Sequence, residues 1–307
     1  MRKLSYYGYE EGYDTRVLRL GNLAFDFAYP QTKKPYYGPE LGAEDTEKWA
    51  TSDQRPFCYM AAQGGKNFSI GLGLQDLLDF SSSGSGHSST IVIGKDGSKV
   101  EVIEPDKFFD QVVLASDDAR FWLESRLAVA RKLQILKGHI GITPKIWLLI
   151  GLYHIQEAVT FSAYSQSAEG GLSGSSPLPE PTGLASLLQL KIGMKAKFGD
   201  NAVVQRGTQI SGKKVWAALW QRVDARYMSV QRWEKHMGGT QLKLLDIYSW
   251  QTVRAGEGEQ AVAEVALAEE DEGEQVVRDS TLDLGKDYWE DFDKEVAYIE
   301  DEWNDNT

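Results

Sequence analysis

The stretch LLQLKIGMKAKF, residues 187–198, alternates apolar and polar side chains along nearly its whole length. Because successive side chains of a β-strand point to opposite faces, this segment would form a ribbon with one apolar face and one lysine-rich face. An extended strand from Leu188 to Phe198 would be roughly 36 Å long, which is close to the span of a tilted strand that crosses a membrane. A half-buried strand of a soluble sheet is the ordinary alternative.

The flanking segments predict a long antiparallel hairpin. Residues 145–164 are rich in β-branched and aromatic residues, which favours a strand of unusual length with 187–198 as its partner. The connection at 165–183 is rich in Gly, Ser and Pro, and it predicts an exposed loop. A third long strand is predicted at 214–228, after a turn at 211–212.

Two segments further upstream also predict β-structure, and a third predicts a helix. Residues 17–30 alternate like a strand, and 68–104 predict a strand, a Gly/Ser-rich tip and a returning hairpin around the turn at 95–98. The segment from residue 117 onward predicts a helix that stops at Gly138 or Gly141, because Ser116 can act as its N-cap and basic residues gather toward its C-terminal end.

The charge of the chain is divided unevenly, although its net value is −12. Residues 255–307 carry 19 acidic and 3 basic side chains, which leaves 26 acidic and 30 basic side chains in residues 1–254. We therefore expect a mildly basic domain over 1–254 and a short acidic C-terminal tail over 255–307. Such an asymmetry suggests either a solvating tail or an intramolecular mask over a basic surface that otherwise meets phosphates.

Within the acidic tail, two segments predict helices. Residues 261–277 form one, and the second places apolar residues at helical spacing, namely Tyr288, Trp289, Phe292, Val296, Ile299 and Trp303. A tail that only solvates does not need such an apolar face. We therefore expect the last helix to dock on the basic domain.

The chain offers no positive case for an enzyme. The stretch at 207–214 resembles a phosphate-binding loop, but it has Lys214 where a Ser or Thr should meet Mg²⁺, and it leads into a β pattern. The four histidines are scattered and Cys58 is the sole cysteine, so we expect no catalytic residues, metal site, cofactor or internal disulfide. With no secretion signal and no run of 18 apolar residues, the default location is the cytoplasm.

From residue 147 to residue 228, the order of these features resembles the pore-forming domain of gasdermins, in particular the fungal gasdermin-like regulators of cell death. The strand WLLIGLYHIQEAVTF leads through a Gly/Ser-rich tip to LLQLKIGMKAKF, and Ser211 and Gly212 precede the further strand KVWAALWQRVDARYM. The block at 68–104 is similar to the family's other hairpin-forming segment. The resemblance covers residues 1 to about 245, and it rests on the order of elements because the family has no short diagnostic motif.

The resemblance implies an α+β fold in which a twisted antiparallel sheet is flanked by helices. It also implies that the protein binds acidic phospholipids at the plasma membrane, forms homo- or hetero-oligomers, and extends two hairpins into a membrane β-barrel. The expected outcome is lytic, pyroptosis-like programmed cell death. Many members are held inactive until a protease removes a C-terminal region, and the tail of this chain departs from the family in being so acidic. Activation by a protease or by a partner protein stays open.

This mechanism assigns roles to two sets of residues. The basic side chains expected to bind acidic lipids, at about 1 kcal/mol each near an anionic surface, are Arg2, Lys3, Arg16, Arg19, Lys33, Lys34, Arg126, Arg131, Lys132 and Lys137. The apolar side chains expected to insert into the membrane are Leu188, Leu190, Ile192, Met194, Phe198, Ile91 and Ile93. The alternative is a soluble, non-enzymatic binding or regulatory protein whose acidic tail recruits a basic partner. Neither function involves nucleic acid.

Overall fold

The structure is a computed structural model, and it describes residues 6–55, 58–63, 67–71, 88–94, 96–137, 144–165, 202–228, 239–244, 262–268 and 284–306. Its strands are β1 (Tyr7–Asp14), β2 (Leu23–Ala24), β3 (Ala50–Arg55), β4 (Cys58–Gln63), β5 (Asn67–Gly71), β6 (Ser88–Gly94), β7 (Asp96–Val102), β8 (Ile146–Ser165), β9 (Ala202–Met228), β10 (Thr240–Lys243) and β11 (Val262–Leu267). Its helices are α1 (Ala43–Trp49), α3 (Pro105–Phe108) with a π-helical turn (Phe109–Val113), α4 (Asp117–Lys137) and α6 (Lys286–Asn306).

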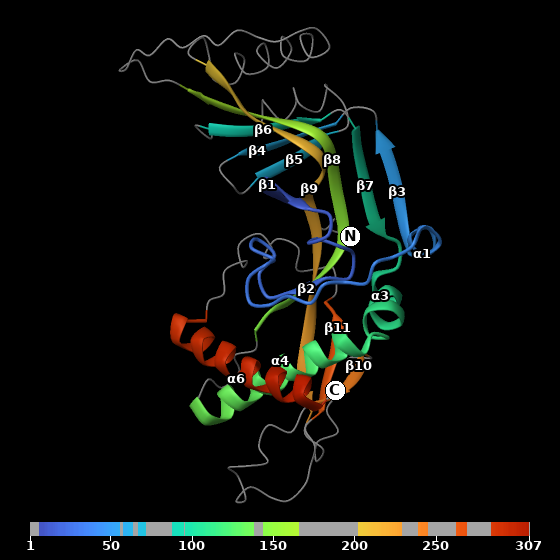
Figure 1. Ribbon diagram of the computed structural model, residues 1–307, viewed down its shortest axis with the longest axis vertical. Coiled ribbons are helices and arrows are strands. Elements are labelled where there is room, and N and C mark those ends of the chain that lie inside the picture. Colours follow the sequence, from blue (N-terminus) through green and yellow to red (C-terminus); the bar gives the residue numbers. More distant parts are fainter. Residues whose placement is uncertain are drawn as a thin grey trace, which may run out of the picture.

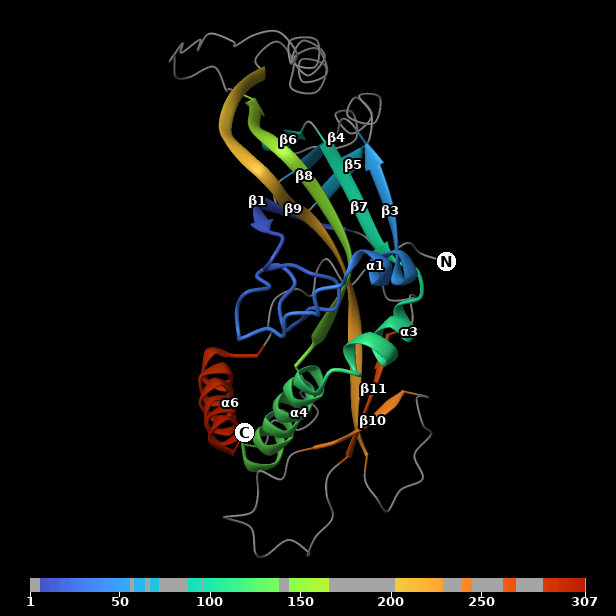
Figure 2. The same cartoon turned by 45° about the vertical axis from the view of Figure 1, so that its right-hand side comes forward.

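The described strands form one curled antiparallel sheet, and together with the helices they make a mixed α+β fold. The main path through the sheet is β10-β11-β9-β8-β6-β4-β5; β1 pairs with β9, β2 and β7 pair with β8, and β3 pairs with β7. The two longest strands, β8 and β9, run side by side along the length of the molecule (Figure 1). Figure 2 shows α4 and α6 next to each other near one end of these strands. The predicted class, an antiparallel sheet with flanking helices, is confirmed at this level.

The long strand predicted at 145–164 is confirmed as β8, but its predicted partner is wrong. β8 pairs with β9 from Ile146 opposite Val223 to Ser165 opposite Ala202. The other edge of β8 pairs in turn with β2, β7 and β6. Both edges of β8 are therefore occupied without the ribbon at 187–198, which lies outside the described residues.

The turn predicted at Ser211 and Gly212 is also wrong, because β9 continues through both residues. The register between β8 and β9 shifts between Gln156 and Ala158, opposite this point. Glu157 and Gly212 both have left-handed backbones, with φ of 51° and 81°, and the Glu157 carboxylate accepts a hydrogen bond from the Gly212 N–H at 2.9 Å. A Ser-Gly pair that reads as a turn in sequence is here a bulge in a continuous ladder.

The two short strands predicted on either side of residues 95–98 exist as β6 and β7, but they do not form the predicted hairpin. Both pair with β8, with β7 opposite 151–156 and β6 opposite 159–164. Their second partners differ as well, since β6 pairs with β4 and β7 pairs with β3. β6 and β7 therefore pair with the same edge of β8 and not with each other.

The strand predicted over 17–30 is wrong except at Leu23 and Ala24. The rest of the segment is irregular, yet its apolar residues Leu18, Leu20, Phe25 and Phe27 are buried. In this irregular segment the Asn22 side chain satisfies two backbone groups. It donates a hydrogen bond to the carbonyl oxygen of Val17 (2.7 Å) and accepts one from the N–H of Gly38 (2.7 Å). The alternation therefore marked burial rather than strand pairing.

Gly38 allows this irregular segment to pack tightly. A Cβ added at Gly38 would lie 2.2 Å from the carbonyl oxygen of Leu20, which is a backbone atom that cannot rotate away. We expect Gly38→Ala to lower the free energy of unfolding by roughly 1–3 kcal/mol, as overpacking does elsewhere. Urea denaturation followed by far-UV circular dichroism measures this loss. The matched control is Gly42→Ala, because a Cβ there would meet only a side-chain oxygen of Asp45 at 4.0 Å; equal stability of the two variants would contradict the explanation.

The helix predicted at 261–277 is wrong for residues 262–267, which form β11. This strand lies between β10 and β9, and its Ala263 and Val265 side chains are fully buried. Pairing on both edges outweighs the preference of alanine and glutamate for helices. The sheet therefore contains strands from both sides of residue 254, where the boundary between the basic domain and the acidic tail was predicted.

The two longest helices agree with the sequence patterns. α4 begins after Ser116, whose hydroxyl oxygen accepts a hydrogen bond from the N–H of Ala119 at 3.4 Å. In α6 the residues at the predicted helical spacing are buried: Tyr288, Trp289, Phe292, Val296 and Ile299. The side chain of Trp303 lies outside the described part of the chain. These residues join the main hydrophobic core, which also includes α4 and parts of β8 and β9.

Candidate functional site

α6 docks on the basic domain through its apolar face. The ring of Phe25 lies 5.4 Å from the rings of both Trp289 and Phe292, measured between centroids. Phe25 also contacts the ring of Trp122 on α4, at 5.2 Å. One aromatic side chain of the segment 17–30 is therefore packed between the two helices.

Around this apolar contact, basic side chains of the domain pair with carboxylates of α6. Lys132 and Glu295 lie 2.7 Å apart, and so do Lys33 and Asp293. We call this set the α6-docking surface. Its basic members are Lys33, Lys34, Arg126 and Lys132, and its acidic members are Asp293, Glu295 and Glu300.

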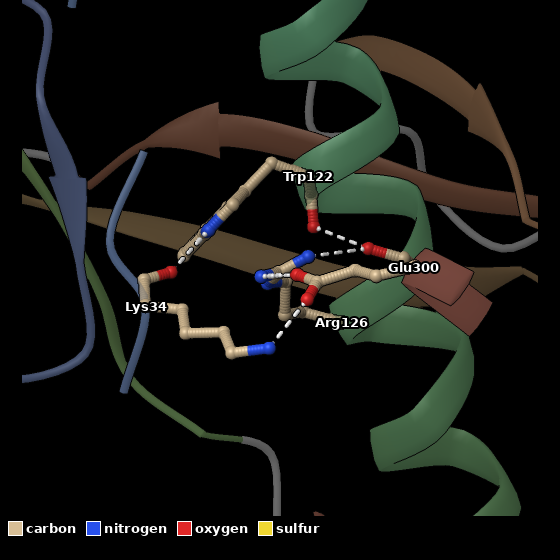
Figure 3. A network of polar contacts seen from close by, with 5 residues as sticks. Lys34, Trp122, Arg126 and Glu300 are labelled. Atoms are coloured by element: carbon tan, nitrogen blue, oxygen red, sulfur yellow. Dashed lines mark hydrogen bonds and ion pairs between the residues drawn. The ribbon is translucent and has the colours of Figure 1, made fainter. Parts of the chain in front are cut away.

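The centre of the α6-docking surface is Glu300, which is shared by two cations (Figure 3). Its Oε1 accepts a hydrogen bond from Nη2 of Arg126 at 2.6 Å, and its Oε2 accepts one from Nζ of Lys34 at 2.7 Å. The two donors come from residues that are 174 and 266 positions away in sequence. α6 therefore bridges α4 and the loop that carries the lysines.

Arg126 is almost completely buried, with 2 % of its surface exposed. Its Nη1 donates a hydrogen bond to the hydroxyl of Ser125 at 2.9 Å, and its guanidinium lies 4.9 Å from the ring of Trp122. Burial lowers the pKa of Arg126, while the hydrogen bond to Glu300 raises it. An arginine remains protonated at neutral pH, so the site holds a buried positive charge that needs an anion.

Lys33 and Lys34 are held in an unusual backbone conformation. Their φ angles are 61° and 47°, in a region that few residues other than glycine adopt. Lys34 also precedes Pro35, which restricts its backbone further. The carbonyl oxygen of Lys34 is fixed by a hydrogen bond from Nε1 of Trp122, at 2.8 Å. A left-handed backbone is energetically unfavourable for a lysine, and it persists only where the surrounding structure imposes it. Here this backbone directs the ammonium groups of both lysines toward α6.

The ion pairs of the α6-docking surface are unequal in strength. Breaking a buried pair by removing one partner costs about 3–5 kcal/mol, whereas an exposed pair contributes about 0–1 kcal/mol. The Arg126 side chain is 3 % exposed and that of Glu300 is 22 % exposed. The pairs of Lys33 and Lys132 include more exposed carboxylates. We therefore assign most of the electrostatic stabilisation of α6 to Arg126 and Glu300.

The pair with Glu300 gives the docking of α6 a pH dependence. Burial alone would raise the pKa of the Glu300 carboxyl, but the hydrogen bonds from Lys34 and Arg126 outweigh it and lower the pKa below its ordinary value of 4.5. A lowered carboxyl pKa contributes stability that is complete above pH 4.5 and is lost as the pH falls through the lowered value. We expect Glu300→Gln to lower the melting temperature at pH 7 and to lower it by a smaller amount at pH 3. Thermal denaturation at both pH values measures this, with Glu290→Gln as an exposed control; an equal loss at both pH values would contradict the assignment.

Four of the residues predicted to bind lipid are brought together in the α6-docking surface. Three of the others make contacts elsewhere. Arg16 pairs with Asp14 and Arg19 with Glu40, while the Arg131 guanidinium lies 5.7 Å from the ring of Tyr227. Lys137 is the last residue of α4. Arg2 and Lys3 lie outside the described residues.

The residues predicted to insert into a membrane are mostly beyond the described residues. Ile91 and Ile93 lie in β6, opposite Phe161 and Val159 of β8, and Ile93 is half-buried. The neighbouring Val92 is fully buried on the other face of the strand. Those outside the described residues are Leu188, Leu190, Ile192, Met194 and Phe198.

Sequence reasoning missed the individual partners on α6. Asp293 and Glu300 are seven residues apart, which places them on one side of a helix, beside the buried residues Phe292 and Ile299. That spacing was visible in the sequence as carboxylates bordering an apolar stripe. The partners on the domain were not visible, because the backbone of Lys33 and Lys34 that aims them at α6 has no sequence signature.

The sequence matches no family model and no curated protein. Among the described residues, no helix combines the length and the apolar character needed to cross a membrane. The same residues contain no cluster of His, Cys, Asp or Glu suited to a metal ion.

Proposed function

We propose that this protein is a gasdermin-like, non-enzymatic pore-forming effector of lytic programmed cell death, and that α6 keeps it inactive by covering its lipid-binding surface. One observation carries the proposal. Four side chains expected on independent grounds to bind acidic lipids, Lys33, Lys34, Arg126 and Lys132, all pair with carboxylates of the same helix.

Release of α6 would expose these four cations and the aromatic residues beneath them. Anionic membrane surfaces attract basic side chains with about 1 kcal/mol per charge, so four residues can hold the protein at a cytoplasmic leaflet. The bound molecules then oligomerise and insert two hairpins, one formed by β8, β9 and the segment between them and the other from the region of β5 and β6. The protein would move from the cytoplasm to the plasma membrane on activation.

The mask would be α6 and not the whole acidic segment. β11 pairs on both edges, and the chain just after it is also anchored. The N–H of Ala268 donates to the carbonyl oxygen of Arg222, and the Gln221 side chain donates to the carbonyl oxygen of Ala268. An activating protease or partner protein therefore needs to act beyond Ala268, so that α6 leaves and β11 stays.

The alternative, in which an acidic tail recruits a basic partner, receives less support. Asp293, Glu295 and Glu300 are each paired with a basic side chain of the same molecule, so these three carboxylates are not available to such a partner while α6 is docked.

The proposal is tested with the full chain carrying a protease recognition sequence inserted after Ala268. Before cleavage we expect no release of dye from anionic liposomes. After cleavage we expect release, much weaker release from neutral liposomes, and loss of release at high salt because salt screens the attraction. The control carries a scrambled, uncleavable insertion. A cleaved protein that dissociates from α6 and still leaves anionic liposomes intact would refute the proposal.

A further inference from the structure

The sheet changes its pairing along one line, which crosses β8 at Glu157. On one edge of β8, β7 pairs with residues 151–156 and β6 pairs with residues 159–164. On the other edge, the register with β9 shifts between Gln156 and Ala158. Both edges of the longest ladder are therefore interrupted at the same residue.

This line divides the sheet into two units. The upper unit, toward the top of Figure 1, contains β4, β5, β6, β8 from Ala158 onward and β9 as far as Ile210. The lower unit contains the other strands, the rest of β8 and β9, and the helices. Figure 1 shows β3 and β7 directed along the molecule, whereas β4, β5 and β6 lie across it. Along the chain, the units are connected by β8, by β9 and by two short links, residues 56–57 and residue 95.

The two units share only a small apolar contact. No described residue of the upper unit belongs to the main hydrophobic core, which contains side chains of α4, α6 and the lower parts of β8 and β9. A second, smaller cluster lies between the units and includes Met60 and Val92 from the upper unit with Tyr153, Ile155 and Trp216 from the lower unit. Units that meet through a small interface are free to move relative to each other.

Glu157 has a strained backbone at the point where the units meet. A φ of 51° is unfavourable for a residue other than glycine. Both Glu157 and its partner Gly212 are exposed, and a Cβ built at Gly212 would meet nothing within 4 Å. The contact that joins the two residues is the hydrogen bond from the Gly212 N–H to the Glu157 carboxylate, at 2.9 Å. Strained backbone conformations of this kind gather at switch regions, where the surrounding contacts maintain them.

We propose that the bulge at Glu157 and Gly212 is a hinge between the two units, and that the Glu157 carboxylate holds the hinge in its present orientation. Hinges are a few residues that absorb a large change in φ and ψ. When the hydrogen bond breaks, Glu157 returns to an extended backbone and the upper unit turns relative to the lower one.

This motion is independent of the proposed function. The cations and the aromatic side chain that hold α6 belong to the lower unit, namely Lys33, Lys34, Arg126, Lys132 and Phe25. The hinge therefore needs neither the release of α6 nor a membrane. Any process that moves the upper unit has to break the bond between Glu157 and Gly212, whether or not α6 is docked.

The test measures the distance between the units by pulsed electron spin resonance on the full chain. Spin labels are attached at Ala202→Cys in the upper unit and at Glu44→Cys on α1 in the lower unit, after Cys58→Ala removes the native cysteine. We expect one narrow distance distribution in this chain and a second maximum when Glu157→Ala is added. Glu157→Gln keeps an acceptor oxygen, so it should keep the narrow distribution. Gln156→Ala changes the exposed neighbour on the same strand, and this matched control should have no effect.

Hydrogen exchange resolved by residue separates a hinge from unfolding. In Glu157→Ala we expect the amide of Gly212 to exchange about tenfold faster, because it loses a hydrogen bond to a charged group. The ladders of β4, β5 and β6 should keep the exchange rates of the unmodified chain. The proposal is overturned if Glu157→Ala leaves the distance distribution unchanged, or if Glu157→Gln or Gln156→Ala broadens it equally. It is also overturned if exchange accelerates throughout the upper unit, since that unit would then unfold rather than turn.

Discussion

Reversing two carboxylates of α6, with Glu295→Arg and Glu300→Arg together, is expected to make the intact chain permeabilise anionic liposomes without cleavage. The exchange breaks the pairs with Lys132 and Arg126 and sets like charges against each other. Loss of the buried pair alone is worth about 3–5 kcal/mol. Since each 1.4 kcal/mol is a factor of ten, the ratio of docked to undocked α6 should fall at least about a hundredfold.

Release of an encapsulated dye measures this effect. The control is Glu290→Arg with Asp301→Arg, which makes the same change in net charge on exposed positions of the same helix. The control chain should remain as inert as the unmodified chain. Equal dye release by both double variants would mean that net charge, and not the docking of α6, determines activity.

Truncation after Arg254 and truncation after Ala268 are expected to have opposite consequences. The shorter chain lacks β11, so β9 loses a pairing partner over Val223–Met228 and β10 loses its only partner within the described sheet. It also loses the buried side chains of Ala263 and Val265. We expect that protein to be insoluble or to unfold without a cooperative transition. The chain that ends at Ala268 keeps the sheet and loses α6 with its buried aromatic and aliphatic side chains, so it should still fold, at lower stability than the full chain, and bind anionic vesicles.

Far-UV circular dichroism with thermal denaturation separates the two truncations. As a point-substitution counterpart, Val265→Asp in the full chain would bury an unpaired carboxylate in the sheet, at a cost of several kcal/mol. A stable, cooperative protein from the truncation at Arg254 would show that β11 is dispensable. In that event the whole segment from 255 onward, and not α6 alone, would be the detachable unit.

The elements with strong periodicity were predictable from the sequence. The apolar positions of 288–299 recur at helical spacing and are buried in α6, and the capping residue Ser116 marks the start of α4. The long β-rich stretch at 145–164 became β8. In each case the local pattern and the tertiary environment favour the same structure, so no competing contact overrides the pattern.

The pairings could not be predicted because they depend on partners that are distant in sequence. β11 has the composition of a helix, and only the open edges of β9 and β10 make it a strand. The residues at 95–98 and 211–212 have the composition of hairpin turns, but the strands beside them pair with β8. Pairing with this long strand provides more hydrogen bonds than a local hairpin does. The docking of the last helix on the rest of the molecule could be predicted, but not that Glu300 would meet Arg126 and Lys34.

Electrical recording across a planar bilayer tests the central claim most directly, because it detects pores and not merely binding. The chain with the protease site after Ala268 is added to a bilayer of anionic lipid, and current is recorded before and after cleavage. We predict no current from the intact chain, and discrete, lasting conductance steps once α6 has been cut free. Binding of the cleaved protein to the same membrane, with no conductance steps at any concentration, would contradict a pore-forming function.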